Sequence, residues 1–223
     1  MSQRGIIIAF AGQKGGSGKS TIAENVAVGL SLQGADTVIV DCDVDQRTAS
    51  KWVSRRNEAI EEGKKLKQIH IALQSDNIKQ GVLDAAKRYD AVVMDVAGRD
   101  GRALRTALIV ADVIYIPIRP SQNDLETLDH VYEILSDTED LNPKRTIKTL
   151  LTMCPTHALI SERADAEEFL VNFKKLMPLS DASISDRKAY RDASLAGEGV
   201  LEGDNEKAKE EIKSLLKELM KYV

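Results

Sequence analysis

The stretch GQKGGSGKST, residues 12–21, decides how this chain folds. It follows the apolar run GIIIAFA of residues 5–11 and precedes a segment with helical spacing of apolar residues, 20–32. A glycine-rich loop between a buried strand and a helix is the context in which a phosphate-binding loop works. Its glycines let backbone N–H groups turn towards an anion, and the positive end of the helix dipole adds to the attraction. The stretch therefore predicts a nucleotide-binding P-loop.

Seven consecutive residues of this loop are expected to contact the nucleotide. They are Gly15, Gly16, Ser17, Gly18, Lys19, Ser20 and Thr21. The Lys19 ammonium should reach the β- and γ-phosphates, and the Ser20 hydroxyl should ligate Mg²⁺. The alternative is a glycine-rich turn that binds nothing, but the loop, the lysine, the hydroxyl and the strand–helix context all coincide here.

Short apolar runs alternate with helical patterns along the rest of the chain. We expect six strands, at residues 5–11, 37–41, 68–73, 91–95, 112–117 and 146–152. Most of these runs are continuously apolar, which indicates strands that are covered on both faces. The pattern predicts one α/β domain over residues 1–223, with a doubly wound, mostly parallel sheet flanked by helices. In such a sheet, ligands bind beyond the carboxyl ends of the strands.

The composition sets limits on function. The 223 residues are 43% hydrophobic and 30% charged, with a net charge of −4, so the chain as a whole is not an obvious nucleic-acid binder. Cys42 and Cys154 form no CxxC pair, and with the absence of a secretory signal this indicates a reducing cytoplasm. No apolar run approaches the roughly 20 residues needed to span a bilayer.

Acidic residues follow two of the predicted strands. Alternation along a strand puts Asp41 and Asp43 on one side, where they can position water on Mg²⁺ and an attacking water. Asp95 directly follows four apolar residues and is the expected Walker B aspartate, which acts on Mg²⁺ through water. The glycine of the following segment, Gly98, suits a loop that senses the γ-phosphate. Asp45 can instead cap the next helix.

The P-loop departs from the ordinary G-x-x-x-x-G-K-[ST] motif, because Gln13 stands at the first glycine and Lys14 precedes the glycine pair. This KGGSGKST form resembles the deviant P-loop of the ParA/MinD family of ATPases. The segment IPIRPSQND, residues 116–124, resembles the IPxxPSxxD segment of the small ParA-like (ParF-type) plasmid partition proteins. The match is good from residue 5 to about residue 128 and partly returns at 184–202.

The resemblance implies roles for the site residues. Lys14 would reach across a nucleotide-sandwich dimer to the partner's phosphates, and Lys14, Lys19 and Asp43 would be the catalytic residues. Ser20 would ligate Mg²⁺ directly, with Asp41 and Asp95 acting through water. In the family, a proline and a glutamine follow the catalytic aspartate. Here VDQ follows Asp43, with one apparent insertion, so whether Asp43 or Asp45 points inward stays open.

The resemblance also implies a function. It predicts a Mg²⁺-dependent ATPase, converting ATP and water to ADP and phosphate, that dimerises around ATP and drives plasmid or chromosome partition. A small centromere-binding adaptor would stimulate hydrolysis, and the cytoplasmic protein would associate with the nucleoid when ATP is bound. The alternative is an ATPase that positions a non-DNA cargo or regulates cell division. A carboxylate-phosphorylating synthetase is disfavoured by Lys14, and an iron–sulfur carrier by the missing CxxC.

Two features near the carboxyl end bear on partners. A basic cluster at helical spacing consists of Arg187, Lys188 and Arg191. The resemblance implies that this cluster is a candidate for non-specific DNA binding. Without the resemblance, the cluster is better explained as a solvated helix face. Apolar residues at helical spacing also end the chain, and they fit either a packed terminal helix or a membrane-binding one. Residues 204–221 carry five acids and five bases, which argues against a membrane partner.

Overall fold

The computed structural model describes residues 4–43, 45–74, 78–96, 101–156 and 162–222. Within these residues, seven strands form one parallel sheet in the order β3-β2-β4-β1-β5-β6-β7. The strands are β1 (Ile6–Phe10), β2 (Thr37–Asp41), β3 (His70–Leu73), β4 (Ala91–Asp95), β5 (Val113–Ile118), β6 (Thr146–Cys154) and β7 (Leu179–Ser185). The predicted α/β class and doubly wound sheet are confirmed.

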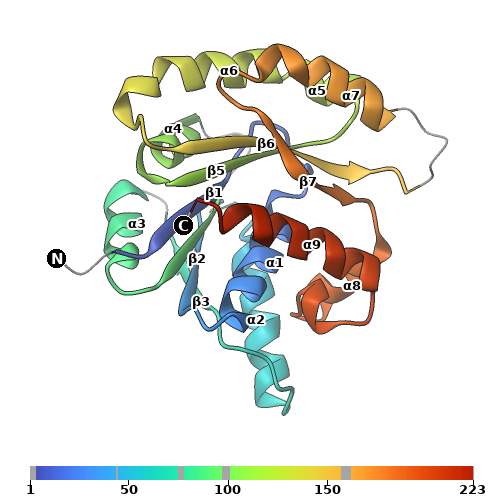
Figure 1. Cartoon of the computed structure of the whole chain (residues 1–223). Helices are drawn as coiled ribbons and strands as arrows, with labels where there is room; N and C mark the ends of the chain where they lie inside the picture. The colour runs from blue at the N-terminus through green and yellow to red at the C-terminus, as the bar shows by residue number, and fades with distance from the viewer. Residues whose placement is uncertain (1–3, 44, 75–77, 97–100, 157–161, 223) are drawn as a thin grey trace.

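Helices cover both faces of the sheet (Figure 1). They are α1 (Lys19–Leu32), α2 (Thr48–Glu61), α3 (Ile78–Ala86), α4 (Gly101–Val110), α5 (Gln122–Leu125), α6 (Leu128–Asp137), α7 (Glu162–Leu170), α8 (Lys188–Leu195) and α9 (Glu206–Leu219), with short 3-10 turns at Glu139–Leu141, Val171–Phe173 and Val200–Glu202. One core cluster includes residues from α3 to α7, and the other includes residues from α1, α2, α8 and α9.

The central strand β1 shows why its residues must be apolar throughout. Ile7 and Ala9 pack on the α3–α7 side, whereas Ile8 and Phe10 pack on the α1 side. Successive side chains point to opposite faces, so a strand between two helical layers needs apolar residues at every position. The continuous apolar runs in the sequence therefore follow from a sheet that is covered by helices on both faces.

Strand β7 was missed in the sequence. Its residues LSDASIS alternate between buried and more exposed positions, and α9 packs against it. As the last strand in the sheet order, it tolerates polar residues on its solvent-facing positions. Its polar composition therefore hid it from a search for continuous apolar runs.

The highly charged segment of residues 55–67 contains a fully buried arginine. Arg56 lies on α2, where its Nη2 is 2.7 Å from Oε1 of Glu202 and its guanidinium lies over the Trp52 ring. Gly197 has a φ of 69°, and a Cβ there would meet the Arg56 backbone nitrogen at 2.5 Å. A glycine is required at this close contact, so the chain around Gly197 packs tightly against α2.

Helix α9 packs against the domain and does not present its apolar face to solvent. Ile212, Leu215, Leu216 and Leu219 are all buried, and α9 lies across α1 (Figure 1). Gly29 on α1 allows this approach, because a Cβ there would lie 2.3 Å from a methyl group of Leu216. The packed-helix interpretation is confirmed, and the membrane-binding alternative is wrong for this face.

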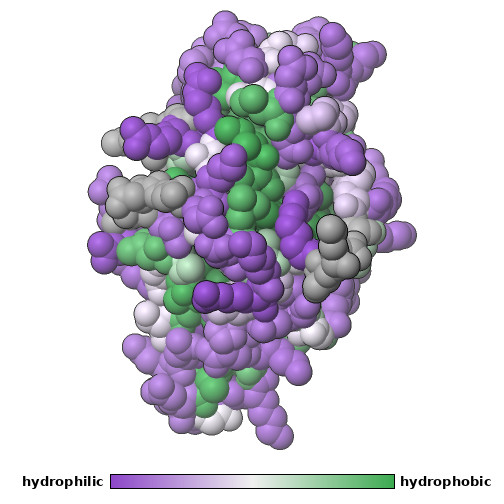
Figure 2. Space-filling model, turned by 90° about the vertical axis from the view of Figure 1, so that its left-hand side faces the viewer, coloured by the Kyte–Doolittle hydropathy of each residue, from purple (hydrophilic) through white to green (hydrophobic). Residues whose placement is uncertain are grey.

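The face of the molecule that is seen from the α3 side is mostly polar. Figure 2 shows the side of the molecule that carries α3 and the start of β1, where hydrophilic residues surround a narrow hydrophobic band. Among the described residues, no helix is both long and apolar enough to cross a membrane.

Candidate nucleotide-binding site

The phosphate loop lies between β1 and α1, at the carboxyl end of the central strand. Gly16 and Gly18 adopt left-handed conformations, with φ of 74° and 82°, and Gly18 is the N-cap residue of α1. Only glycine adopts this conformation readily, and it allows consecutive N–H groups to face one concavity, which is an anion-binding arrangement. The predicted context of the loop, a buried strand followed by a helix, is present.

Two side chains from neighbouring strands hold carbonyl groups of this loop. Arg119, just after β5, donates from Nε to the Gly16 carbonyl at 2.9 Å, and its Nη2 also donates to that oxygen. Thr152 on β6 places its hydroxyl 2.9 Å from the Ser17 carbonyl. In a trans peptide the carbonyl and the next N–H point in opposite directions, so these contacts help to orient the loop's N–H groups. Sequence reasoning missed both residues.

Lys19 lies inside the loop. Its side chain is nearly buried, and Nζ donates to the Lys14 carbonyl at 2.7 Å. Burial lowers the pKa of Lys19, and the nearby carboxylates of Asp95 and Asp43 oppose that effect. A desolvated ammonium at the start of α1, next to a set of glycine N–H groups, is suited to binding phosphate oxygens.

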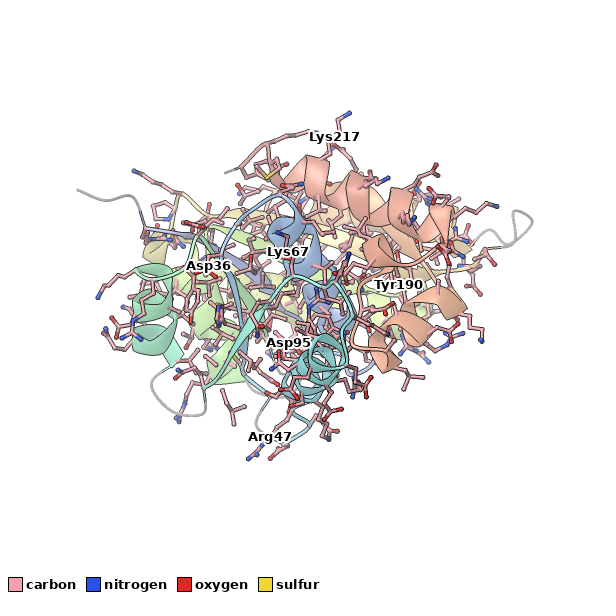
Figure 3. All side chains as sticks on the ribbon, turned by 90° about the horizontal axis from the view of Figure 1, so that it is seen from below. Asp36, Arg47, Lys67, Asp95, Tyr190 and Lys217 are labelled. Atoms are coloured by element: carbon pink, nitrogen blue, oxygen red, sulfur yellow. The ribbon has the colours of Figure 1, made fainter. Side chains whose placement is uncertain are left out.

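Asp95 is the buried acid of the site. The strand register places it beside Asp41, because β2 and β4 pair Asp41 with Asp95. Burial raises the pKa of Asp95 to about 7, Ser20 opposes the shift through a hydrogen bond, and Asp41 adds to it. Its Oδ2 is buried and accepts no hydrogen bond within the described residues. An orphaned carboxylate oxygen beside a hydroxyl fits a hard cation such as Mg²⁺ (Figure 3 shows Asp95 in the interior).

Asp41 is fully engaged by the protein. Its Oδ1 accepts from the backbone N–H of Asp43, and its Oδ2 accepts from both the N–H and the hydroxyl of Ser50. Ser50 lies in the first turn of α2, so Asp41 supplies an acceptor for that helix start. Any contact of Asp41 with metal-bound water would be additional to these bonds.

Asp43 and Asp45 differ in their surroundings. Asp43 is half-buried, accepts from the Gln46 N–H, and influences both Lys19 and Asp95 electrostatically. Asp45 is exposed. The expectation that Asp45 caps the next helix is wrong, because α2 begins after Arg47 and its first turn is served by Asp41. Val44, between the two aspartates, lies outside the described residues.

Lys14 lies on the exposed side of the loop. Its side chain is 44% exposed, and Nζ is 3.7 Å from Oδ1 of Asp124. Asp124, on α5, is nearly buried, and its Oδ2 is 3.8 Å from Nε of Arg119. The two lysines of the loop therefore face different surroundings, one internal and one external.

A small pocket of about 50 Å³ adjoins the first turn of α1, beyond the carboxyl ends of β6 and β7. Its lining includes Thr21, Ile22, Met153, Ile184, Arg187 and Arg191. Met153 has a φ of 51°, an uncommon conformation for a non-glycine residue, and such strain concentrates at ligand sites. A ligand that occupied the phosphate loop would have this pocket next to it.

The basic cluster near the carboxyl end is internally paired. Arg187 lies 2.8 Å from Glu211, and its side chain is only 20% exposed. Lys188 pairs with Asp192 at 3.1 Å, and Arg191 pairs with Asp186 at 2.6 Å. Each predicted DNA-contacting cation therefore has a carboxylate partner, which reduces the positive potential that DNA would meet. Gly98, expected to sense the γ-phosphate, lies outside the described residues.

Comparisons with known proteins agree with this geometry. The family model described as ATPase MipZ matches residues 6–142. The maintenance of carboxysome distribution protein A of Halothiobacillus neapolitanus is 28% identical, with 98% of each chain covered. Protein ParA of Rhizobium radiobacter is 28% identical over 60% of this chain and 58% of its own length. A solved ATP complex of a Cyanothece McdA variant matches with a TM-score of 0.73 and 16% identity, over 98% of both chains. The chain belongs to the ParA/MinD family of ATPases, through its MipZ branch.

Proposed function

We propose that this protein is a Mg²⁺-dependent ATPase that dimerises when ATP binds and uses this switch to position a cargo. The observation that carries the proposal is the placement of the two loop lysines. Lys19 lies inside its own loop, whereas Lys14 is 44% exposed on the outer side. A cation on the outside of a phosphate loop is available to the phosphates of a second protomer, where it would neutralise charge that develops during transfer.

The remaining groups fit the same reaction. Ser20 and Asp95 would hold Mg²⁺, which supplies charge neutralisation at the phosphates when it is bound. Asp43 would orient the attacking water, since it is half-buried and electrostatically linked to Lys19, whereas Asp45 is exposed. Fixed carboxylates within hydrogen-bond reach serve this role.

The cargo that we favour is a large protein assembly. The relative that matches 98% of this chain is named for carboxysome distribution. The second candidate cargo is DNA, which the partial likeness to protein ParA favours. Against DNA stands the paired state of Arg187, Lys188 and Arg191, because charges that already have partners bind phosphates less strongly. An adaptor that links the ATP-bound dimer to the cargo would complete either system.

Light scattering with a non-hydrolysable ATP analogue and Mg²⁺ tests the switch. Wild type should be dimeric with the analogue and monomeric with ADP, and Lys14→Ala should stay monomeric with both. Lys188→Ala is the matched control, since it removes an exposed lysine elsewhere, and it should dimerise as wild type does. A wild type that stays monomeric with the analogue would refute the proposal.

The cargo needs a separate measurement. Fluorescence anisotropy on unrelated DNA duplexes at low salt, with and without the ATP analogue, should show weak binding that a Lys188→Glu, Arg191→Glu variant barely changes. Tight, ATP-dependent binding that this double variant abolishes would favour the DNA cargo instead.

A further inference from the structure

Asp124 is a buried carboxylate shared between two cations. It is 4% exposed, and its two oxygens face different partners: Oδ1 lies 3.7 Å from Lys14 and Oδ2 lies 3.8 Å from Arg119. Oδ2 accepts no hydrogen bond from the residues that the structure describes. A carboxylate this poorly solvated depends on its counter-ions, because burying an uncompensated charge is costly.

We propose that Arg119 is the positioning residue that lets Lys14 leave Asp124. The inference rests on the proposed function, in which Lys14 must move to the phosphates of a second protomer. If Lys14 were the sole counter-ion, its departure would strand a buried carboxylate. Arg119 remains beside Oδ2 after Lys14 departs, so Asp124 keeps a positive neighbour and the release of Lys14 is less costly.

The geometry keeps Arg119 in place during this exchange. Its Nε and Nη2 both donate to the Gly16 carbonyl, so the guanidinium is anchored to the phosphate loop. Gly16 leaves the room that this requires, because a Cβ there would lie 2.5 Å from Nη2 of Arg119. Lys14 has no comparable anchor in the described contacts: its ammonium contacts Asp124 at 3.7 Å. The two side chains are similarly exposed, so the hydrogen bonds to Gly16 are what distinguish Arg119. The planar fork of arginine suits the fixed partner, and the flexible stem of lysine suits the mobile one.

Arg119 therefore influences Lys14 through Asp124. A series of substitutions can separate this influence from the effect of the hydrogen bonds between Arg119 and Gly16. Arg119→Gln leaves Asp124 with Lys14 alone and should hold that lysine more firmly. Arg119→Lys keeps a charge beside Asp124 but lacks the fork. Adding Asp124→Asn to Arg119→Gln removes the carboxylate that retains Lys14, so it should restore release.

The first measurement reads Lys14 directly in the nucleotide-free protein. Limited acylation of lysine amines, quantified by mass spectrometry, gives the labelling of Lys14 relative to Lys188 in the same molecule. We expect Arg119→Gln to lower this ratio by about fivefold, the upper range for one partly exposed ion pair. Arg119→Lys and the Arg119→Gln, Asp124→Asn double variant should both label as wild type. An unchanged ratio in Arg119→Gln would overturn the inference.

The second measurement is dimerisation with the ATP analogue, after circular dichroism has shown that each variant is folded. Arg119→Gln should need about fivefold more protein to dimerise, and the double variant should recover. If the double variant is as weak as Arg119→Gln, then Arg119 acts through Gly16 and the inference fails. If wild type does not dimerise while the labelling pattern holds, the proposed function fails and the Arg119 inference stands.

Discussion

Two buried acids at the phosphate-loop edge and Glu211 on α9 differ in how completely the protein pairs them. At the loop edge, Asp95 and Asp124 each have a buried Oδ2 without a hydrogen bond from the described residues. Near the carboxyl end, Glu211 accepts from Arg187, from Tyr190 and from the Ser185 hydroxyl.

Asp95 is suited to a ligand at its unpaired oxygen, whereas the groups around Glu211 stabilise the fold. Buried polar atoms in native proteins are nearly always hydrogen-bonded, so the exceptions point to sites that something else completes. Glu211 and Arg187 already pair with one another, and their partner Tyr190 is buried, with its hydroxyl 3.4 Å from the Ala208 carbonyl on α9. Charge by itself therefore does not identify a binding residue.

The largest expected effect comes from removing Lys19. Lys19→Ala should lower ATP affinity by roughly 100-fold, because a hydrogen bond to a charged group contributes about 1.5–3 kcal/mol. Isothermal titration provides the measurement, and Lys188→Ala is the control that should bind as wild type does. If a folded Lys19→Ala protein bound ATP with normal affinity, the phosphate loop would not be the ATP-binding site.

The next effect distinguishes the two aspartates that follow β2. Asp43→Asn keeps an acceptor for the Gln46 N–H but loses the charge, and it should slow single-turnover hydrolysis by about 100-fold or more while ATP still binds. The matched Asp45→Asn should hydrolyse within about twofold of wild type, since Asp45 is exposed. If Asp45→Asn is the inactive variant instead, the insertion shifts the catalytic position by two residues.

A third pair of substitutions tests whether the ion pair between Arg187 and Glu211 stabilises the fold. Arg187→Ala leaves the Glu211 carboxylate with its two hydroxyl donors but without the arginine, and it should lower the free energy of unfolding by about 2 kcal/mol. Lys188→Ala, at the next residue and in an exposed pair, should change it by less than about 0.5 kcal/mol. Urea unfolding measures both. Equal small losses would mean that Arg187 is as free as a surface residue and available for DNA.

The smallest expected effect concerns Glu24 on α1. Burial raises the pKa of Glu24 to about 8, and the charge of Asp95 adds to the shift. The folded state therefore binds the proton more tightly than the unfolded state does. The resulting penalty is absent below about pH 4.5, where both states are protonated, and grows as the pH rises to about 8.

Glu24→Gln should remove this penalty. Its thermal midpoint should exceed that of wild type by a few degrees at pH 8, corresponding to about 1 kcal/mol or more, and by less at pH 5. Glu58→Gln, at an exposed position on α2, is the control and should show no such pH dependence. If wild type and Glu24→Gln had the same thermal midpoint at pH 8, ionisation of Glu24 would not destabilise the folded state.

The sequence predicted those parts of the fold and site whose signals are local. The phosphate loop, the strands ending in Asp41 and Asp95, and the apolar face of α9 each depend on neighbouring residues, and the structure contains all of them. Strand β7 was missed because one side of it tolerates polar residues.

Contacts between distant residues could not be predicted. Arg119 and Asp124 follow the phosphate loop by about 100 residues, and only the sheet order places β5 beside β1. The same limit affected the basic cluster. Glu211, which neutralises Arg187, lies 24 residues further along the chain and on another helix, so Arg187 looked unpaired in the sequence.

The central claim is that Lys14 completes the site of the other protomer, and a mixing experiment tests it most directly. Lys14→Ala and Asp43→Asn should each be inactive alone. In a mixed dimer, the Lys14→Ala protomer keeps its own Asp43 and receives Lys14 from its partner, so one of the two sites is complete. Equal mixing should restore ATPase activity, to no more than half of the wild-type rate, because each mixed dimer has one working site of two. If Lys14 acts within its own protomer, no site in any dimer is complete, and mixing will restore nothing.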